Sequence, residues 1–247
     1  MRLSTLSYMT TTSKLAGRQE IAEGTMAFHF EKPSGWTFEA GQAVDITLLT
    51  PSETDAEGNT RTFTIASAPY ERSLMVATRM RDTAFKRVLK VMPVGTAVQM
   101  ERPAGDLTLH RDAARTAVLL SGGIGITPFR SIAFGAAKEH LPHRIFLFYS
   151  NRRPEDAPFL AELQTLEKEN PNYKLIASMT GIEKSQRPWH GETGVIDKEM
   201  LARYLKDATS PVYYIAGPPG MVKGLHTMIN ESGVDERDIR TEEFSGY

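Results

Sequence analysis

Two glycine-rich segments have the composition of phosphate-binding turns. The first, Gly122–Pro128 (GGIGITP), lies between the apolar run Ala117–Ser121 (AVLLS) and a segment with helical spacing. Glycines in such a turn let the backbone come close to a phosphate, and the positive end of the following helix attracts the phosphate charge. The segment therefore predicts a pyrophosphate site, although glycines at a strand-to-helix turn also serve close packing alone.

The second turn, Gly217–Met221 (GPPGM), follows the apolar run Val212–Ala216. Ligands of an open parallel sheet lie beyond the carboxyl ends of the strands, so the two turns are expected to meet at one crevice. The alternative for the second turn is a rigid connection with proline at a helix start. The residues predicted to hold a dinucleotide here are Gly122, Gly123, Gly125, Ile126, Thr127, Pro128, Gly217, Pro218, Pro219 and Met221.

The third distinctive segment is Arg61–Ser67 (RTFTIAS). Strand alternation would put Arg61 and Phe63 on one face and Thr62 and Thr64 on the other. A guanidinium suits bidentate recognition of phosphate, and an aromatic ring suits the flat apolar face of a cofactor. An arginine two residues from an aromatic residue is commonplace in strands, so the meaning of the segment depends on the elements around it.

Those elements divide the chain in two. Before about Arg111, short β-branched or aromatic runs alternate with turn formers, which predicts an antiparallel β-barrel with Greek-key connections, one helix at 83–92 and an exposed loop at 50–60. After it, apolar runs alternate with helical patterns, which predicts a doubly wound parallel α/β sheet. We therefore predict a barrel domain of residues 1–111 and an α/β domain of residues 112–247. The predicted strands are 26–30, 44–49, 61–67, 74–78, 98–102, 117–121, 145–149, 174–178 and 212–216, and the predicted helices of the second domain are 128–139, 158–169 and 220–230.

Composition excludes several kinds of function. The 29 Lys and Arg against 30 Asp and Glu give a net charge of −1, which provides no broad attraction to nucleic acid or to an anionic membrane. The absence of cysteine excludes disulfides, thiol nucleophiles and Cys-ligated iron–sulfur clusters. His140 and His143 lack a third ligand at a suitable spacing, so we predict no metal site. Redox chemistry would therefore require an organic cofactor.

The hydropathy of the chain bears on its location. No apolar stretch approaches the ~18 residues of a membrane span, and the first residues lack the apolar core of a secretion signal. We expect a cytoplasmic protein that binds no nucleic acid and does not insert into a membrane.

The three segments RTFTIAS, GGIGITP and GPPGM, in this order, resemble the ferredoxin–NADP⁺ reductase superfamily of flavin-dependent reductases. The resemblance covers essentially the whole chain. It implies that Arg61 pairs with the FAD phosphates, that Phe63 stacks on the isoalloxazine and that Thr64 hydrogen-bonds near N5. It also implies pyrophosphate contacts at the start of the barrel helix, where RDTAFK replaces the glycine and serine of many members. The expected FAD-binding residues are Arg61, Thr62, Phe63, Thr64, Thr78, Arg81, Thr83 and Ala84.

The resemblance also implies roles for the C-terminal residues. A terminal aromatic residue covers the second flavin face in many members, and Tyr247 matches this pattern. A glutamate near the C-terminus assists hydride transfer in some members, and Glu243 is the nearer match. Thr64, Glu243 and Tyr247 are thus the expected catalytic residues. Many members carry cysteine where this chain has Ala216, but hydride transfer depends mainly on positioning rather than on a thiol.

Coenzyme choice is expected to be decided at Tyr149–Asp156. Ser150, Arg152 and Arg153 together could hold the extra phosphate of NADPH, because two guanidiniums and a hydroxyl suit a phosphate monoester. Asp156 could instead serve NADH, and the two arginines could equally be solvated loop charges. The residue types favour NADPH, with NADH as the alternative.

These features predict a reductase that passes a hydride from NAD(P)H to FAD and then electrons to a separate acceptor. Ferredoxin, flavodoxin, an oxygenase component and a small molecule are the candidate acceptors. The alternative enzyme is a reductase of free flavins or quinones. Two alternatives of other classes are a flavin-binding electron-transfer subunit that takes no hydride and a flavin-free dinucleotide-binding protein. The sequence predicts no oligomeric state.

Overall fold

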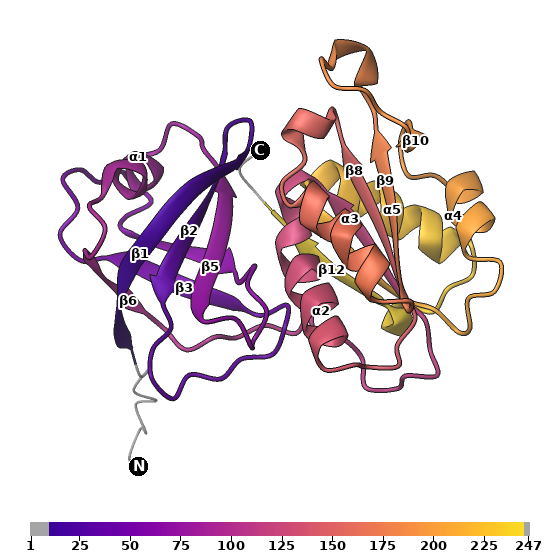
Figure 1. Cartoon of the computed structure of the whole chain (residues 1–247), viewed down its shortest axis with the longest axis horizontal. Helices are drawn as coiled ribbons and strands as arrows, with labels where there is room; N and C mark the ends of the chain where they lie inside the picture. The colour runs from indigo at the N-terminus through magenta and orange to yellow at the C-terminus, as the bar shows by residue number, and fades with distance from the viewer. Residues whose placement is uncertain (1–9, 245–247) are drawn as a thin grey trace.

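The computed structural model describes residues 10–244 and contains two sheets that lie side by side (Figure 1). The first sheet is antiparallel, and the Ile65–Val76 bridge joins its two edge strands, so that the sheet closes into a barrel. Its members are β1 (Thr11–Ala22), β2 (Thr25–Glu31), β3 (Ala43–Leu48), β4 (Thr60–Thr64), β5 (Ser73–Arg79) and β6 (Ala97–Met100), in the spatial order β4-β3-β6-β1-β2-β5.

Helix α1 (Ala84–Val91) packs against the barrel core. Thr83 begins the helix as its N-cap, and its hydroxyl accepts a hydrogen bond from the backbone amide of Lys86. Residues of the helix that are close together on one face, including Phe85 and Leu89, are buried among the apolar side chains of the strands. Capping and one apolar face are what a short helix needs to be stable on a barrel.

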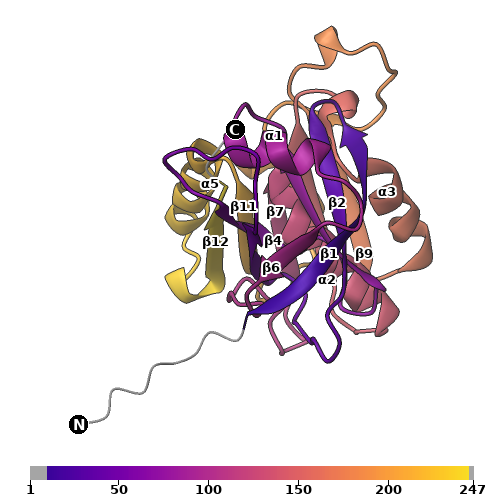
Figure 2. The ribbon, with the colours of Figure 1, turned by 90° about the vertical axis from the view of Figure 1, so that its left-hand side faces the viewer.

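The second sheet is parallel and lies between two layers of helices (Figures 1 and 2). Helices α2 (Ile126–Lys138) and α3 (Leu160–Glu169) cover one face, and α4 (Lys198–Tyr204) and α5 (Pro219–Glu231) cover the other. Because helices cover both faces of this sheet, its central strands are buried on both sides and consist of continuous apolar runs. The strands are β7 (Ala117–Gly122), β8 (Ile145–Asn151), β9 (Tyr173–Met179), β10 (Glu192–Thr193), β11 (Val212–Gly217) and β12 (Ile239–Glu243), in the order β10-β9-β8-β7-β11-β12.

This architecture confirms the predicted fold class, but three strands and one α-helix within residues 10–244 were not predicted. They are β1, β10, α4 and β12. Helix α2 also begins two residues before the predicted start, because Pro128 lies in its first turn, where proline is tolerated. The predicted domain boundary after Arg111 falls in the connection between β6 and β7 and remains a prediction. Within residues 10–244, no helix has both the length and the apolar character needed to cross a bilayer.

The side chain of Arg130 connects the two domains. It extends from α2 and is buried, and its guanidinium donates to the Ala66 carbonyl at 2.8 Å and to the Glu71 carboxylate at 2.9 Å on the barrel side. It also donates to Glu162 of α3 at 2.9 and 3.0 Å. The hydroxyl of Ser131, the next residue of α2, donates to the Ser67 carbonyl at 2.8 Å. These bonds fix α2 to the segment that follows β4.

Candidate functional site

The two glycine-rich turns are in contact at the carboxyl ends of β7 and β11, which are neighbours in the sheet. A Cβ atom on Gly125 would lie 2.2 Å from the carbonyl oxygen of Ala216, and one on Gly122 would lie 2.3 Å from the sulfur of Met221. A Cβ on Gly217 would lie 3.2 Å from backbone atoms of Gly122. The close approach of the two turns therefore requires glycine at position 125, where the neighbouring atom is backbone, and it brings the two predicted ligand-binding turns together.

Several predicted dinucleotide contacts have side chains that face the interior. Ile126, Thr127 and Pro128 are buried in the first turn of α2, and the Thr127 hydroxyl donates to the Ile124 carbonyl at 3.1 Å. Any contact of these three residues with a ligand would have to be made by the main chain. Gly123 begins a short 3₁₀ turn (Gly123–Gly125) with φ +53°, a conformation that favours glycine. Pro219 is exposed at the first position of α5, as expected for proline.

An apolar cavity of about 330 Å³ lies beside the second turn. Its walls come from Ser150 at the end of β8, from Val195 and Ile196, and from α5 with Gly220 and Met221. Such a cavity has the apolar walls and the single hydroxyl that suit an adenosine. Ser150, predicted as a coenzyme contact, thus lies at an open site.

Of the residues Ser150, Arg152 and Arg153, predicted to hold the extra phosphate of NADPH, Arg153 is bonded to carboxylates. The guanidinium of Arg153 makes two hydrogen bonds to the Asp156 carboxylate, at 2.7 and 2.9 Å, and one to Glu23 of the barrel at 2.6 Å. Arg152 is exposed. The Arg153 guanidinium is therefore already bonded to two carboxylates, and Arg152 is the exposed arginine of the two.

A hydrogen bond joins the two domains at the end of β4. The Thr64 hydroxyl, which is buried, donates to Oε1 of Glu242 at 2.7 Å. Burial raises the pKa of Glu242, and the hydrogen bond from Thr64 acts in the opposite direction. In the sheet, Glu242 pairs with Ala216 and so lies beside the second glycine-rich turn. Thr64, Glu242 and Gly217–Met221 therefore meet at one place.

Glu242, and not the predicted Glu243, contacts Thr64. Glu243 is the next residue of β12, pairs with Gly217 and is exposed. Successive side chains of a strand point to opposite faces, so only one of two adjacent glutamates can face the barrel. This alternation indicates from the sequence that only one of the two glutamates faces the barrel. Which of the two does so depends on the register of β12 against β11. Tyr247 lies outside the described residues.

The rest of the predicted flavin segment is distributed between the barrel interior and the surface. Phe63 is 8% exposed and packs on Phe85, with ring centroids 5.8 Å apart. Thr62 is exposed, and its hydroxyl donates to the Asp45 carboxylate. Thr78 is buried in β5. Stacking of Phe63 on a flavin ring therefore stays a prediction.

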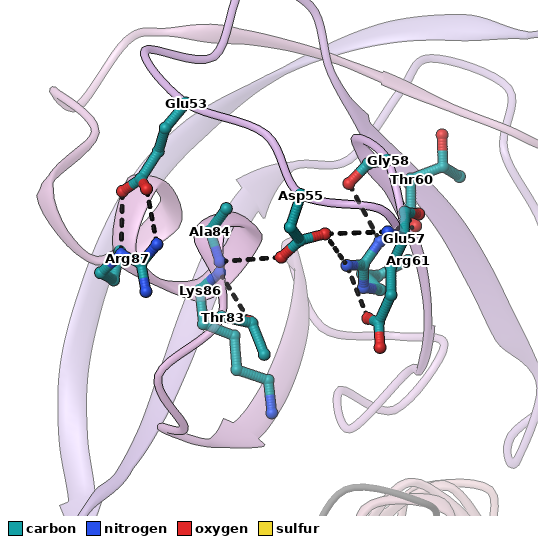
Figure 3. Close-up of polar contacts among 10 residues, drawn as sticks. All are labelled: Glu53, Asp55, Glu57, Gly58, Thr60, Arg61, Thr83, Ala84, Lys86 and Arg87. Carbon is teal, nitrogen blue, oxygen red and sulfur yellow. Dashed lines mark hydrogen bonds and ion pairs between the residues drawn. The ribbon is translucent and has the colours of Figure 1, made fainter.

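Arg61 and the start of α1 lie close together around one carboxylate (Figure 3). The Arg61 guanidinium contacts Asp55 at 3.3 Å, and the other carboxylate oxygen of Asp55 accepts from the Ala84 amide at 3.0 Å. Thr83 caps the helix, and Arg81 is exposed. A guanidinium beside a helix N-terminus is a donor set that suits phosphate. Among residues 10–244, no group of three or more His, Cys, Asp or Glu side chains is placed to hold a metal ion.

The chain is similar in sequence to known oxidoreductases. Residues 119–227 match the oxidoreductase NAD-binding domain family. Over 224 residues, or 89% of the chain, the sequence is 27% identical to the glycine betaine monooxygenase reductase subunit of Chromohalobacter salexigens. The chain spans 60% of the length of that relative.

Solved structures show the same two-domain fold. The ferredoxin–NADP⁺ reductase of Neisseria gonorrhoeae, with bound FAD and NADP, superposes with a TM-score of 0.77 at 20% identity, over 95% of this chain and 98% of that one. The flavohemoglobin-like FAD/NAD-binding domain of the nitric oxide dioxygenase of Vibrio cholerae gives 0.79 at 20% identity, over 94% and 98%. Residues 119–227 are thus similar to an oxidoreductase NAD-binding domain, and the chain as a whole has the two-domain fold of these FAD- and NAD-binding structures.

Proposed function

We propose that the chain is an NAD(P)H-dependent flavoprotein reductase that takes a hydride from the coenzyme onto FAD and delivers electrons to a separate acceptor. The hydrogen bond between Thr64 and Glu242 carries this proposal. It joins the strand proposed to hold FAD to the strand end beside the proposed nicotinamide turn. A similar chain of known structure contains FAD and NADP, and the similar sequence from Chromohalobacter salexigens is a reductase subunit.

The residues present fit both cofactors. Arg61, Arg81 and the N-terminus of α1 would bind the FAD phosphates, and Thr64 would lie at the reactive edge of the flavin. The two turns at Gly122–Pro128 and Gly217–Met221 would hold the pyrophosphate and nicotinamide of the coenzyme, with its adenosine in the cavity at Ser150. Phe63 is proposed to contact the flavin ring, and Tyr247 to cover its other face.

Bound FAD supplies a two-electron acceptor that can release electrons singly or in pairs. The protein supplies position and a proton. The Thr64 hydroxyl is held by Glu242 and is thereby oriented. Because burial raises the pKa of Glu242, its carboxyl group holds a proton at a higher pH than an exposed glutamate does. Glu242 is thus suited to exchange a proton with Thr64.

The proposed acceptor is a separate protein or small molecule. The 247 residues contain no cysteine, so they offer no thiolate ligands for an iron–sulfur cluster to which the flavin could pass electrons. An oxygenase component is favoured because the similar sequence belongs to a monooxygenase. Ferredoxin, flavodoxin and free small molecules are the other proposed acceptors.

Dye reduction tests the proposed function. The chain is reconstituted with FAD, and reduction of an artificial electron acceptor is followed with NADH and NADPH in parallel. Turnover with at least one coenzyme is expected. A protein that retains FAD but reduces no dye with either coenzyme would instead be a non-catalytic electron-transfer subunit.

Coenzyme preference is expected to depend on Arg152. Replacing Arg152 by Ala is expected to lower kcat/KM for NADPH about tenfold and to leave the value for NADH unchanged, because a charge-assisted hydrogen bond to the extra phosphate is lost. Steady-state kinetics with both coenzymes measure this ratio. Arg144→Ala is the control, because Arg144 is an exposed arginine that directly precedes β8, whereas Arg152 directly follows it. An unchanged ratio in Arg152→Ala would assign Arg152 to the solvated surface.

A further inference from the structure

The loop of residues 51–59, here called the acidic loop, places its carboxylates on the basic groups around α1 (Figure 3). Glu53 contacts Arg87 of α1 through both carboxylate oxygens, at 2.6 and 2.9 Å. Glu57 pairs with Arg61 at 2.7 Å. The loop is exposed, as predicted, but each of its acidic side chains is fixed by a cation.

Asp55 is the member that reaches the helix N-terminus. One of its oxygens contacts the Arg61 guanidinium at 3.3 Å, and the other accepts from the Ala84 amide at 3.0 Å. The hydrogen bond from Ala84 is the main cause that holds the pKa of Asp55 below its usual value, so the carboxylate is charged at neutral pH. An anion therefore already bridges the guanidinium and the first amide of the helix.

Arg61 does not need Asp55 to keep its position. Its other terminal nitrogen donates to the carbonyl oxygens of Glu57, Gly58 and Thr60, at 2.9, 3.1 and 2.8 Å. Together with the ion pair to Glu57, these bonds hold the guanidinium against the loop. Removing the Asp55 carboxylate would free the Ala84 amide, the Glu57 amide, which also donates to it at 3.0 Å, and one face of Arg61, and none of these four contacts is made by that carboxylate.

We propose that Asp55 is a built-in competitor for the phosphate groups of the flavin and so sets which flavins the chain retains. This inference rests on the proposed function, which assigns Arg61 and the start of α1 to the FAD phosphates. A carboxylate and a phosphate oxygen satisfy the same donors, so FAD must displace Asp55 to reach them. The phosphates of FAD or FMN then add less to the binding affinity than the donors of the chain would allow. A bound flavin therefore exchanges more readily with flavin in solution.

Flavin titrations of the flavin-free full chain test the proposal. FAD, FMN and riboflavin are titrated into the wild type, Asp55→Ala and Asp55→Asn, and binding is followed by flavin fluorescence. Asp55→Ala is expected to bind FAD and FMN at least about tenfold more tightly and riboflavin unchanged, because riboflavin has no phosphate. Asp55→Asn, which keeps the size but removes the charge, is expected to show a smaller gain of the same sign.

The matched control is Glu53→Gln, which removes another charge of the acidic loop but touches neither Arg61 nor Ala84. It is expected to leave FAD affinity within about twofold of the wild type. Weaker FAD binding by Asp55→Ala would overturn the proposal, because it would mean that Asp55 favours FAD binding instead of competing with it. Equal gains for FAD and riboflavin, or for Asp55→Ala and Glu53→Gln, would also overturn it. If no form of the chain bound any flavin, the proposed function itself would fail.

Discussion

Replacing Glu242 by Gln is expected to slow the reduction of bound FAD by NAD(P)H about 10- to 100-fold and to leave FAD affinity unchanged. The carboxylate accepts the Thr64 hydroxyl bond at 2.7 Å. A hydrogen bond to a charged group contributes about 1.5–3 kcal/mol, which corresponds to this range of rates. The measurement is rapid anaerobic mixing of the FAD-loaded protein with coenzyme, followed by flavin absorbance.

The pH profile of that rate separates a role in proton exchange from a merely structural one. Because burial raises the pKa of Glu242, the wild-type rate is expected to change through a step above the usual glutamate range, and Glu242→Gln should lack this step. Glu243→Gln, at the exposed neighbour, is the control and should retain both rate and step. A Glu242→Gln protein with the wild-type rate and profile would remove Glu242 from the mechanism.

Replacing Arg130 by Met is expected to lower the free energy of unfolding by about 2 kcal/mol. The substitution leaves the Ala66 carbonyl and the carboxylates of Glu71 and Glu162 without their shared donor. Breaking a buried ion pair on one side typically costs 3–5 kcal/mol, and the smaller value follows from the partial exposure of Glu71 and Glu162, 27% and 36%. Urea denaturation followed by circular dichroism measures the change.

Arg237→Met is the comparison for this substitution. Arg237 and Asp235 form an ion pair on the surface, with side chains 87% and 48% exposed, and such pairs contribute little. No measurable change in the urea midpoint is expected. If Arg130→Met also unfolded at the wild-type urea concentration, the bonds between α2 and the segment after β4 would not stabilise the chain.

Elements with strong apolar patterns were predictable from the sequence, and polar ones were not. The buried runs of β7, β8, β9 and β11 are recognisable because both faces of a parallel strand need apolar side chains. The twelve-residue strand β1 was missed because it contains Lys14, Arg18 and Glu20 and exposes much of its length. Strand β12 was missed for a similar reason, since four of its five residues are polar and it forms the edge of the sheet.

For the site, the sequence indicated the segments but not their contacts. Thr64 was predicted from its segment, whereas its partner depends on the register of β12, which no local pattern encodes. The bonds from Asp55 to the α1 amide and from Arg153 to Glu23 join residues 29 and 130 positions apart. Contacts over such distances depend on how the finished elements pack, so single-sequence patterns do not reveal them.

We propose that the barrel holds FAD within reach of a coenzyme bound by the neighbouring domain. Anaerobic mixing of the FAD-loaded chain with one equivalent of NADPH, and separately of NADH, tests it most directly. The yellow absorbance of the flavin is expected to disappear in a single turnover with at least one of the two coenzymes. A folded protein that stays colourless after incubation with FAD, or one that remains fully yellow with both coenzymes, would contradict it.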